Sequence, residues 1–393
     1  GEMGKWLRIV GSFTIVFFFF FYVGAQFIGG GKTLENLFGI KKIYGMLIVV
    51  GLVVPYTIYG GFRSVTYTDV VQAIVMIVAL IAAPIAGIIY LANLPEGAVF
   101  GSGISDALHN AGDAYSTLTG GAVLKEGTPL SSALNNIFPN MQGIVSGLGT
   151  GIIIAGAFSW FFGYMGGQPQ LTMRFMAIKD ARQAKIARNI GVLWTIIAYI
   201  GALMIGWIGI ALFGPDGLKD QETVMPEVLT TIFHPIIAGI LITGVLAAII
   251  STANSLLILS ATELSENIVK PLRGRKTDSK TSLLYSRIIT GILSVIALVL
   301  AYFSSGNLIY TIVGYVWAGI GSTFSVVILF TLFWKRFHGT AALLTIISGL
   351  LFTIIWISTE MDKIVTSRLL TFIVALVVAV LSTYLFKKRE VSR

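Results

Sequence analysis

Long apolar runs with few or no charged side chains limit the folds open to this chain more than any other feature. A run of about 18 apolar residues can cross a bilayer as a helix, where lipid offers no partners for unpaired backbone groups. The sequence is 55% hydrophobic and 11% charged, which excludes an ordinary soluble domain. We predict an all-α polytopic membrane protein with about ten transmembrane helices, at residues 7–28, 43–61, 67–92, 143–165, 189–213, 235–262, 284–303, 308–333, 340–358 and 367–386.

Basic residues fall in alternate connections between these spans. Residues 174–188 and 270–280 are rich in Lys and Arg, whereas 93–142 and 214–234 carry mainly Asp and Glu. The positive-inside rule therefore predicts a multi-pass protein of the inner (plasma) membrane with both ends of this chain in the cytoplasm. Lys32, beyond the first span, is an exception on the outer side. The net charge of +9 is thus explained by topology, and nucleic-acid binding is not expected.

Polar side chains interrupt the sixth predicted span. Ser251, Thr252, Asn254 and Ser255 closely follow Ala248, and a helical rotation of about 100° per residue puts all five on one broad face. Hydroxyl and carbonyl oxygens grouped in this way suit a partly dehydrated hard cation such as sodium. The alternative is that these hydroxyls bond to their own helix and help neighbouring helices to pack.

Three glycines and a proline lie within residues 163–169, at the end of the fourth predicted span. A helix should break there, and a broken helix in a membrane is tolerated where it lines a cavity, as in secondary transporters. Trp160 and Tyr164 share a helix face, so they are candidates to bind a small solute together with Gly167 and Gln168. An aromatic belt at the membrane interface is the alternative.

Asp69 is a carboxylate directly before an apolar run. A charge at the centre of a membrane costs roughly 2.5–3.5 kcal/mol, so it usually has a function, here as a cation waypoint near the cytoplasm. The alternative is a carboxylate in the first helical turn, where it complements the helix dipole and Ser64 or Thr66 caps the helix. The sequence leaves both interpretations open.

Small residues alternate with aromatic ones across residues 314–322. Tight helix packing is the favoured interpretation, and Tyr315 and Trp317 are the side chains that would face a solute cavity beside it. The sequence shows no nucleophile with a histidine partner, no phosphate-binding loop and no cysteine, so an enzyme is not expected.

These motifs, with the spacing between them, resemble the sodium:solute symporter family, and within it the sodium/proline symporter branch. The most specific piece is the Ala-Ala-x-x-Ser-Thr stretch that begins at Ala247, followed by Ser-Ala-Thr-Glu at residues 260–263. The resemblance covers essentially the whole chain. It is carried by the stretches Gly60–Gln72, Gly163–Ala177, Ala238–Glu263 and Tyr315–Ser322.

The resemblance implies a leucine-transporter-type fold of two inverted repeats within a single transmembrane domain, 1–393. About three helices of that fold would precede this chain, with their half of the sodium and substrate sites. The implied divisions are 1–93 for the end of repeat one, 94–142 for an extracellular loop, 143–334 for repeat two and 335–393 for extra C-terminal helices.

By the same resemblance, the Ala248 carbonyl and the side chains of Ser251 and Thr252 are expected to bind sodium. Asp69 matches an aspartate associated with sodium passage or with a second sodium site, which Asn254 and Ser255 would share. The residues implied for the solute and its gate are Trp160, Tyr164 and Gln168.

Two departures from the branch lie near the expected solute. Gly166 and Gly167 stand where the branch usually has one glycine, and Asn254 and Ser255 stand where it typically has Ser-Cys. The predicted function is therefore a sodium-coupled symporter in the lipid bilayer for proline or another small amino or carboxylic acid, with no obligatory protein partner. A proton-coupled transporter of the same fold and a solute-sensing membrane domain are the alternatives.

Overall fold

Helices make up all the regular secondary structure of the residues that the computed structural model describes: 2–94, 159–164, 166–214, 217–273, 279–304, 306, 308–363 and 365–386. Within these residues, nine segments are long and apolar enough to cross a membrane. They match nine of the predicted spans. The remaining one, at 143–165, lies outside the described residues except at its end. The expected polytopic helical class is confirmed.

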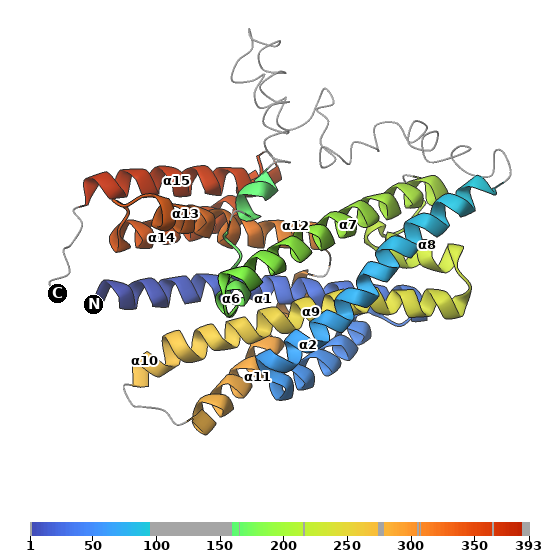
Figure 1. The fold of residues 1–393 in the computed structure, drawn as a ribbon, viewed down its shortest axis with the longest axis horizontal. Helices are drawn as coiled ribbons and strands as arrows, with labels where there is room; N and C mark the ends of the chain where they lie inside the picture. The colour runs from blue at the N-terminus through green and yellow to red at the C-terminus, as the bar shows by residue number, and fades with distance from the viewer. Residues whose placement is uncertain are drawn as a thin grey trace, which may run out of the picture.

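The elements follow one another along the chain with short connections in the second half (Figure 1). In order they are α1 (Glu2–Phe38), α2 (Lys42–Ala92), α6 (Pro169–Met176), α7 (Ala181–Phe213), the 3₁₀ turn η2 (Gln221–Thr223), α8 (Val224–Ile232), α9 (Pro235–Thr262), the π-helix η3 (Glu263–Val269), α10 (Lys270–Arg273), α11 (Ser279–Ser304), α12 (Ile309–Val316), the π-helix η4 (Trp317–Ser322), α13 (Thr323–Phe333), α14 (Gly339–Ser358), the 3₁₀ turn η5 (Met361–Lys363) and α15 (Ser367–Leu385).

α2 consists of two membrane-length arms rather than one straight rod. Its 51 residues would extend about 77 Å if straight, far beyond the roughly 30 Å of a bilayer core. The hydroxyls of Tyr56 and Thr68 are hydrogen-bonded, although a straight helix would hold them about 18 Å apart. The chain therefore reverses between the two arms, residues 42–60 and 65–92, which are the second and third predicted spans.

α1 lies in the middle of the bundle, with α13, α14 and α15 on one side and α2, α9 and α11 on the other (Figure 1). The Met3 side chain lies beside Gly339, and His338 hydrogen-bonds to the carbonyl of Phe386. The start of α1 and the end of α15 therefore lie on the same side of the molecule.

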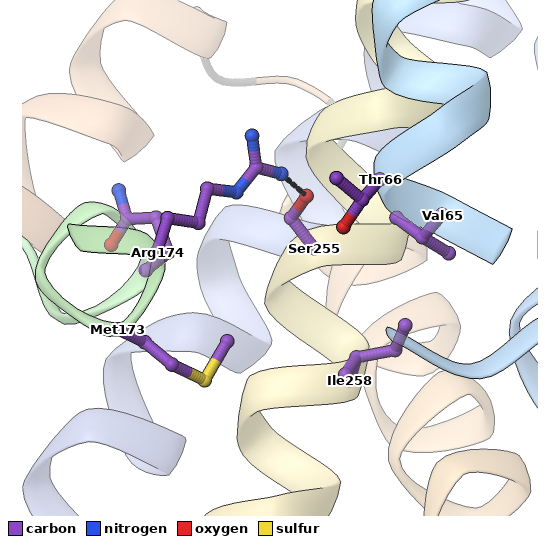
Figure 2. A pocket seen from close by; sticks show the side chains of 7 residues that line it. Val65, Thr66, Met173, Arg174, Ser255 and Ile258 are labelled. Atoms are coloured by element: carbon purple, nitrogen blue, oxygen red, sulfur yellow. Dashed lines mark hydrogen bonds between the residues drawn. The ribbon is translucent and has the colours of Figure 1, made fainter. Parts of the chain in front are cut away.

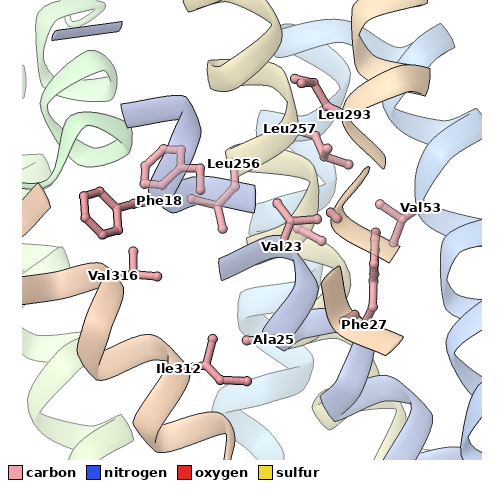
Figure 3. Packing of buried hydrophobic residues seen from close by; sticks show 14 of the residues in the cluster. Phe18, Val23, Ala25, Phe27, Val53, Leu256, Leu257, Leu293, Ile312 and Val316 are labelled. Atoms are coloured by element: carbon pink, nitrogen blue, oxygen red, sulfur yellow. The ribbon is translucent and has the colours of Figure 1, made fainter. Parts of the chain in front are cut away.

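The largest apolar cluster joins α1, α2, α9, α11 and α12 around fully buried α1 side chains such as Phe19, Phe27 and Ile28. Packing in lipid depends on close fit and dispersion rather than on the exclusion of water, so these interlocking side chains hold the helices together. Figure 3 labels Phe18, Val23, Ala25, Phe27, Val53, Leu256, Leu257, Leu293, Ile312 and Val316 of this cluster.

The outer faces of the helices carry exposed apolar side chains. Val70, Val71 and Ile74 lie exposed on the second arm of α2, and Ile190 and Leu193 on α7. On a soluble protein such a surface would promote aggregation. Here it is the surface expected of helices that contact lipid.

Candidate functional site

Asp69 lies between α9 and α6 and uses both of its carboxylate oxygens. The Ser251 hydroxyl donates to Asp69 Oδ1 over 2.5 Å, and the Arg174 Nη2 group donates to Asp69 Oδ2, also over 2.5 Å. The same Nη2 lies 2.6 Å from the Ser255 hydroxyl oxygen. We call Asp69, Arg174, Ser251 and Ser255 the Asp69 cluster; Figure 2 shows Arg174 reaching from α6 to Ser255.

The surroundings of Asp69 bear on the two interpretations that the sequence left open. The second arm of α2 begins at about residue 65, so Asp69 lies near the start of that arm, where a carboxylate complements the helix dipole. Its carboxylate also contacts two other elements, α9 and α6. Only 11% of the Asp69 side chain is exposed, and an acidic group in such a position requires partners.

Arg174 was not predicted as a site residue. In sequence it is one more basic residue of a connection that obeys the positive-inside rule. Its only distinguishing signal is its place on the short helix that begins at Pro169, directly after the predicted break. The structure shows that it is an ion-pair partner of Asp69.

The other predicted sodium residues lie on α9 around the Asp69 cluster. Ala248 and Thr252 are half-buried next to Ser251. Asn254 is fully buried, and its side-chain oxygen accepts a 2.5 Å hydrogen bond from Thr57 on the first arm of α2. The structure therefore brings Ser251 and Ser255 to Asp69, whereas Asn254 contacts the other arm of the same helix.

The predicted helix break is present. The described helical residues before the break reach Tyr164, Gly166 has a φ of 115°, and α6 starts at Pro169. A positive φ of this size favours glycine. The Gly167 amide donates to the Ser325 hydroxyl over 3.1 Å, which satisfies a backbone group that the break leaves free.

Glycines allow this broken segment to lie directly against η4. A Cβ atom at Gly167 would overlap the carbonyl oxygen of Gly321, and a Cβ at Gly321 would lie 2.8 Å from the Gly163 Cα. The backbones therefore touch without side chains between them. This supports the interpretation of residues 314–322 as a tight packing motif.

Five rings form a continuous series that we call the aromatic chain. Successive ring centroids are 5.5 Å apart for Tyr310 and Trp160, 6.4 Å for Trp160 and Tyr164, 5.4 Å for Tyr164 and Trp317, and 5.6 Å for Trp317 and Tyr22. Trp160 also donates a 3.0 Å hydrogen bond to the Tyr310 hydroxyl. Trp160 and Tyr164 are thus neighbours as predicted, and Trp317 joins them.

Gln168 and Tyr315 are two further residues that were predicted to bind the solute. Gln168 is buried, with 5% of its surface exposed, and its Nε2 has no hydrogen-bond partner among the described residues. An unpaired buried amide is costly, so it is a candidate to bind a polar solute. Tyr315 is half-buried on α12.

Arg368 of α15 is a second basic residue that the sequence did not identify. Its guanidinium lies 4.3 Å from the centre of the Trp160 ring, and its Nε donates to the Ser159 hydroxyl over 3.1 Å. A Cβ at Gly314 would overlap this guanidinium, so the glycine makes room for it. An extra C-terminal helix thus contributes to the aromatic chain through a cation–π contact.

Lys32, the exception to the charge pattern, is buried in an ion cluster. Its ammonium lies 2.7 Å from Asp220 and 2.6 Å from Glu222, while the other oxygen of Glu222 accepts a hydrogen bond from the Tyr310 amide in the first turn of α12. Beside it, the Asn36 amide donates to Glu227. We call Lys32, Asp220 and Glu222 the Lys32 cluster; Lys32 and Asp220 line a pocket of about 740 Å³.

The ion pair with Lys32 lowers the pKa of Asp220, which lies outside the membrane-spanning segments. Burial alone would raise the pKa of the Asp220 carboxyl, but the hydrogen bonds from the Lys32 ammonium and the Glu222 amide outweigh it and hold that pKa below its usual value. An opposite charge at hydrogen-bond distance has this effect. The positive charge of Lys32 is therefore paired rather than free.

A bundle of membrane-length helices, with a broken helix beside a buried carboxylate and a series of aromatic rings, defines a polytopic membrane transporter. A solved structure of a Na⁺-coupled sialic acid symporter, in its substrate-bound outward-open state, has the same fold. It superposes with a TM-score of 0.70 at 15% sequence identity and covers 97% of this chain and 75% of that chain. The expected leucine-transporter-type fold is thereby confirmed.

The sodium:solute symporter family matches residues 2–349, and the chain belongs to this family, which consists of transporters and not of enzymes. Similar proteins include the high-affinity proline transporter PutP of Bacillus subtilis, 36% identical over 91% of this chain. The osmoregulated proline transporter OpuE of Bacillus subtilis is 31% identical over 96% of it, and sodium/proline symporter 2 of Staphylococcus saprophyticus is 31% identical over 91%. The chain spans 68%, 71% and 63% of these three relatives, respectively.

Proposed function

We propose that this chain forms the transport pathway of a sodium-coupled symporter that imports a small polar solute. The observation that carries the proposal is the Asp69 cluster, where a carboxylate and two serine hydroxyls from α2 and α9 face the broken helix that ends at α6. A carboxylate with neutral oxygen ligands suits a hard monovalent cation. The similar proline transporters support proline, or another small amino or carboxylic acid, as the solute.

The proposed sodium ligands are all on α9 and α2. Ser251 is central, because its hydroxyl already contacts Asp69. The carbonyl of Ala248 and the hydroxyl of Thr252 complete one proposed set with it. Asp69, Ser255 and Asn254 would serve a second site or a waypoint, where one lone pair of the Asn254 oxygen already accepts from Thr57.

The proposed solute site lies along the broken segment. Trp160, Tyr164 and Trp317 provide apolar rings and Gln168 provides an unpaired amide, a combination that suits a small molecule with an apolar body and a polar end. Gly167 lets the backbone approach, and Tyr315 is a further candidate. The residues proposed for solute and those proposed for sodium are joined by α6, which follows Gln168 directly and carries Arg174.

Transport would proceed by alternating access between two states, with sodium stabilising the state that binds solute. We propose a plasma-membrane location with both ends of the described chain in the cytoplasm, and the two repeats expected from the family resemblance. The start of α1 and the end of α15 lie on the same side of the molecule. This supports the placement of both ends on one side of the membrane.

Uptake of radiolabelled proline into membrane vesicles tests the proposal, with sodium outside and then choline in its place. Sodium-dependent accumulation is the expected result. Accumulation that persists in choline would favour a proton-coupled transporter instead. If neither proline nor a panel of amino and carboxylic acids is accumulated but one of them binds, the sensing alternative gains support.

A further inference from the structure

The Arg174 guanidinium donates hydrogen bonds to oxygen atoms that the proposed function assigns to sodium. A single nitrogen, Nη2, contacts both Asp69 Oδ2 and the Ser255 hydroxyl. The Ser251 hydroxyl donates to the other oxygen of the carboxylate, Oδ1. The guanidinium is therefore a cation held in place by ligands of the kind a sodium ion would use.

Arg174 and a sodium ion would compete for these ligands. Each lone pair that accepts a hydrogen bond from the guanidinium is lost to a metal ion, and two positive charges a few ångströms apart repel each other beside the buried Asp69 carboxylate. The space around the arginine is also small. The cavity lined by Val65, Met173, Arg174 and Ser255 measures about 10 Å³, at the lower limit for one water molecule.

The two partners differ in how easily they can move. Asp69 belongs to a long helix that packs along α9, and its side chain is 11% exposed, whereas the Arg174 side chain is 40% exposed. α6 has only eight residues and none of them is buried. Non-helical residues flank it, from Gly166 to Gln168 on one side and before α7 on the other.

We propose that Arg174 is a tethered substitute for sodium, an inference that rests on the proposed function. In one state its guanidinium binds Asp69 and Ser255 and fastens α6 to α2 and α9. When sodium takes these oxygens, Arg174 withdraws and α6 is released. Because Gln168 directly precedes α6, this exchange would couple the sodium site to the solute site.

Sodium-dependent labelling of one thiol tests the exchange without any knowledge of the solute. The 393-residue chain has no cysteine, so Met173→Cys introduces a single thiol into it, on a half-buried position of α6. We expect sodium chloride, compared with choline chloride, to raise the maleimide labelling rate of Met173→Cys in proteoliposomes. In Met173→Cys with Arg174→Gln, labelling should be fast without sodium and no longer respond to it.

Sodium affinity gives the second readout, on the chain without the added cysteine. If Arg174 holds the site for nine-tenths of the time, removing it should lower the half-saturating concentration of ²²Na⁺ about tenfold. Arg174→Lys, which keeps the charge but not the planar fork, should lie between Arg174→Gln and the parent. The matched control is Arg182→Gln, an exposed arginine in the first turn of α7, which should behave as the parent.

The outcomes distinguish the proposed exchange of Arg174 with sodium from the proposed symporter function. A parent protein that binds sodium, with an Arg174→Gln variant that needs equal or more sodium, overturns the exchange and leaves the symporter intact. A parent that shows no sodium binding and no sodium-dependent uptake overturns both. Tighter sodium binding in Arg174→Gln, with Arg182→Gln unchanged, supports the exchange even if the cysteine variant fails to fold.

Discussion

The two ion clusters of this protein contain the same kinds of charges but are built differently. In the Lys32 cluster the cation belongs to α1, which lies in the middle of the bundle, and two carboxylates hold it. In the Asp69 cluster the carboxylate belongs to a long packed helix and the cation to an eight-residue helix with no buried residues. The first arrangement fixes the positions of its charges, whereas the second leaves its cation free to exchange.

The hydrogen bonds of Glu222 and Asp69 differ in the same way, since those of Glu222 are the more fixed. Glu222 also accepts the Tyr310 amide at the start of α12, so the Lys32 cluster completes the hydrogen bonding of a helix end. Asp69 accepts from Ser251, a hydroxyl that can turn to other partners. We therefore expect variants of the Lys32 cluster to lower stability and variants of the Asp69 cluster to impair transport.

The largest effect is expected from Lys32→Met. Removing this ammonium leaves Asp220 and Glu222 close together without a counter-charge, and breaking a buried ion pair in this way costs about 3–5 kcal/mol. Thermal unfolding of the purified protein in detergent, followed by intrinsic fluorescence, should show a clear drop in Tm. The exposed Lys219 is the matched control; an equal drop in Lys219→Met would argue against a structural role specific to Lys32.

Asp69→Asn is expected to impair sodium-dependent transport by about 10- to 100-fold, which corresponds to the roughly 1.5–3 kcal/mol of a hydrogen bond to a charged group. The Tm should change much less than in Lys32→Met, and solute binding should weaken less than the transport rate. Initial rates of uptake and equilibrium binding, measured side by side, check this. Asp180, an exposed helix cap, provides the control Asp180→Asn; equal losses of binding and rate in Asp69→Asn would contradict the assigned role.

Ser251→Ala is expected to raise the sodium concentration for half-maximal uptake about fivefold to tenfold, because one hydroxyl contributes about 1 kcal/mol. Thr252→Val should act in the same direction. Uptake at a series of sodium concentrations measures the effect, with Ser260→Ala as a buried serine control on the same helix. Sodium dependence that is unchanged in both Ser251→Ala and Thr252→Val would remove them from the proposed site.

The smallest effect is a pH dependence that belongs to the Lys32 cluster. The pKa of Asp220 is lower in the folded protein than its usual value, so its contribution to stability is complete above about pH 4 and is lost as the pH falls through the lowered pKa. The Tm of the parent should therefore decline more steeply than that of Asp220→Asn below about pH 4. Parallel pH profiles for the two proteins would show that Asp220 has no such linkage.

Much of the fold could be predicted, because its strongest determinants are local. Apolar runs of span length mark the helices directly, and the glycines before Pro169 mark the break. The reversal inside α2 was predicted only as a connection between two spans. Its hydrogen bond between Tyr56 and Thr68 is a tertiary contact that no local pattern contains.

The candidate site was predictable where one helix face gathers polar residues, as at Ser251 and Ser255. The basic partners were not, because Arg174 and Arg368 resemble ordinary flanking charges in sequence and gain their roles from helices far away in the chain. Lys32 stood out as an exception to the charge rule, yet its partner Glu222 lies 190 residues away. Pairings of this kind depend on the packing of the bundle.

The hydrogen bond between Tyr56 and Thr68 also has a mechanical consequence. It fastens the two arms of α2 together next to Asp69, while the bond from Thr57 to Asn254 fastens the first arm to α9. With the bond from Ser251 to Asp69, the two arms and α9 form a stiff triangle. A force applied through Arg174 would then displace this triangle as a whole or pull the arginine away, but it would not bend the arms separately.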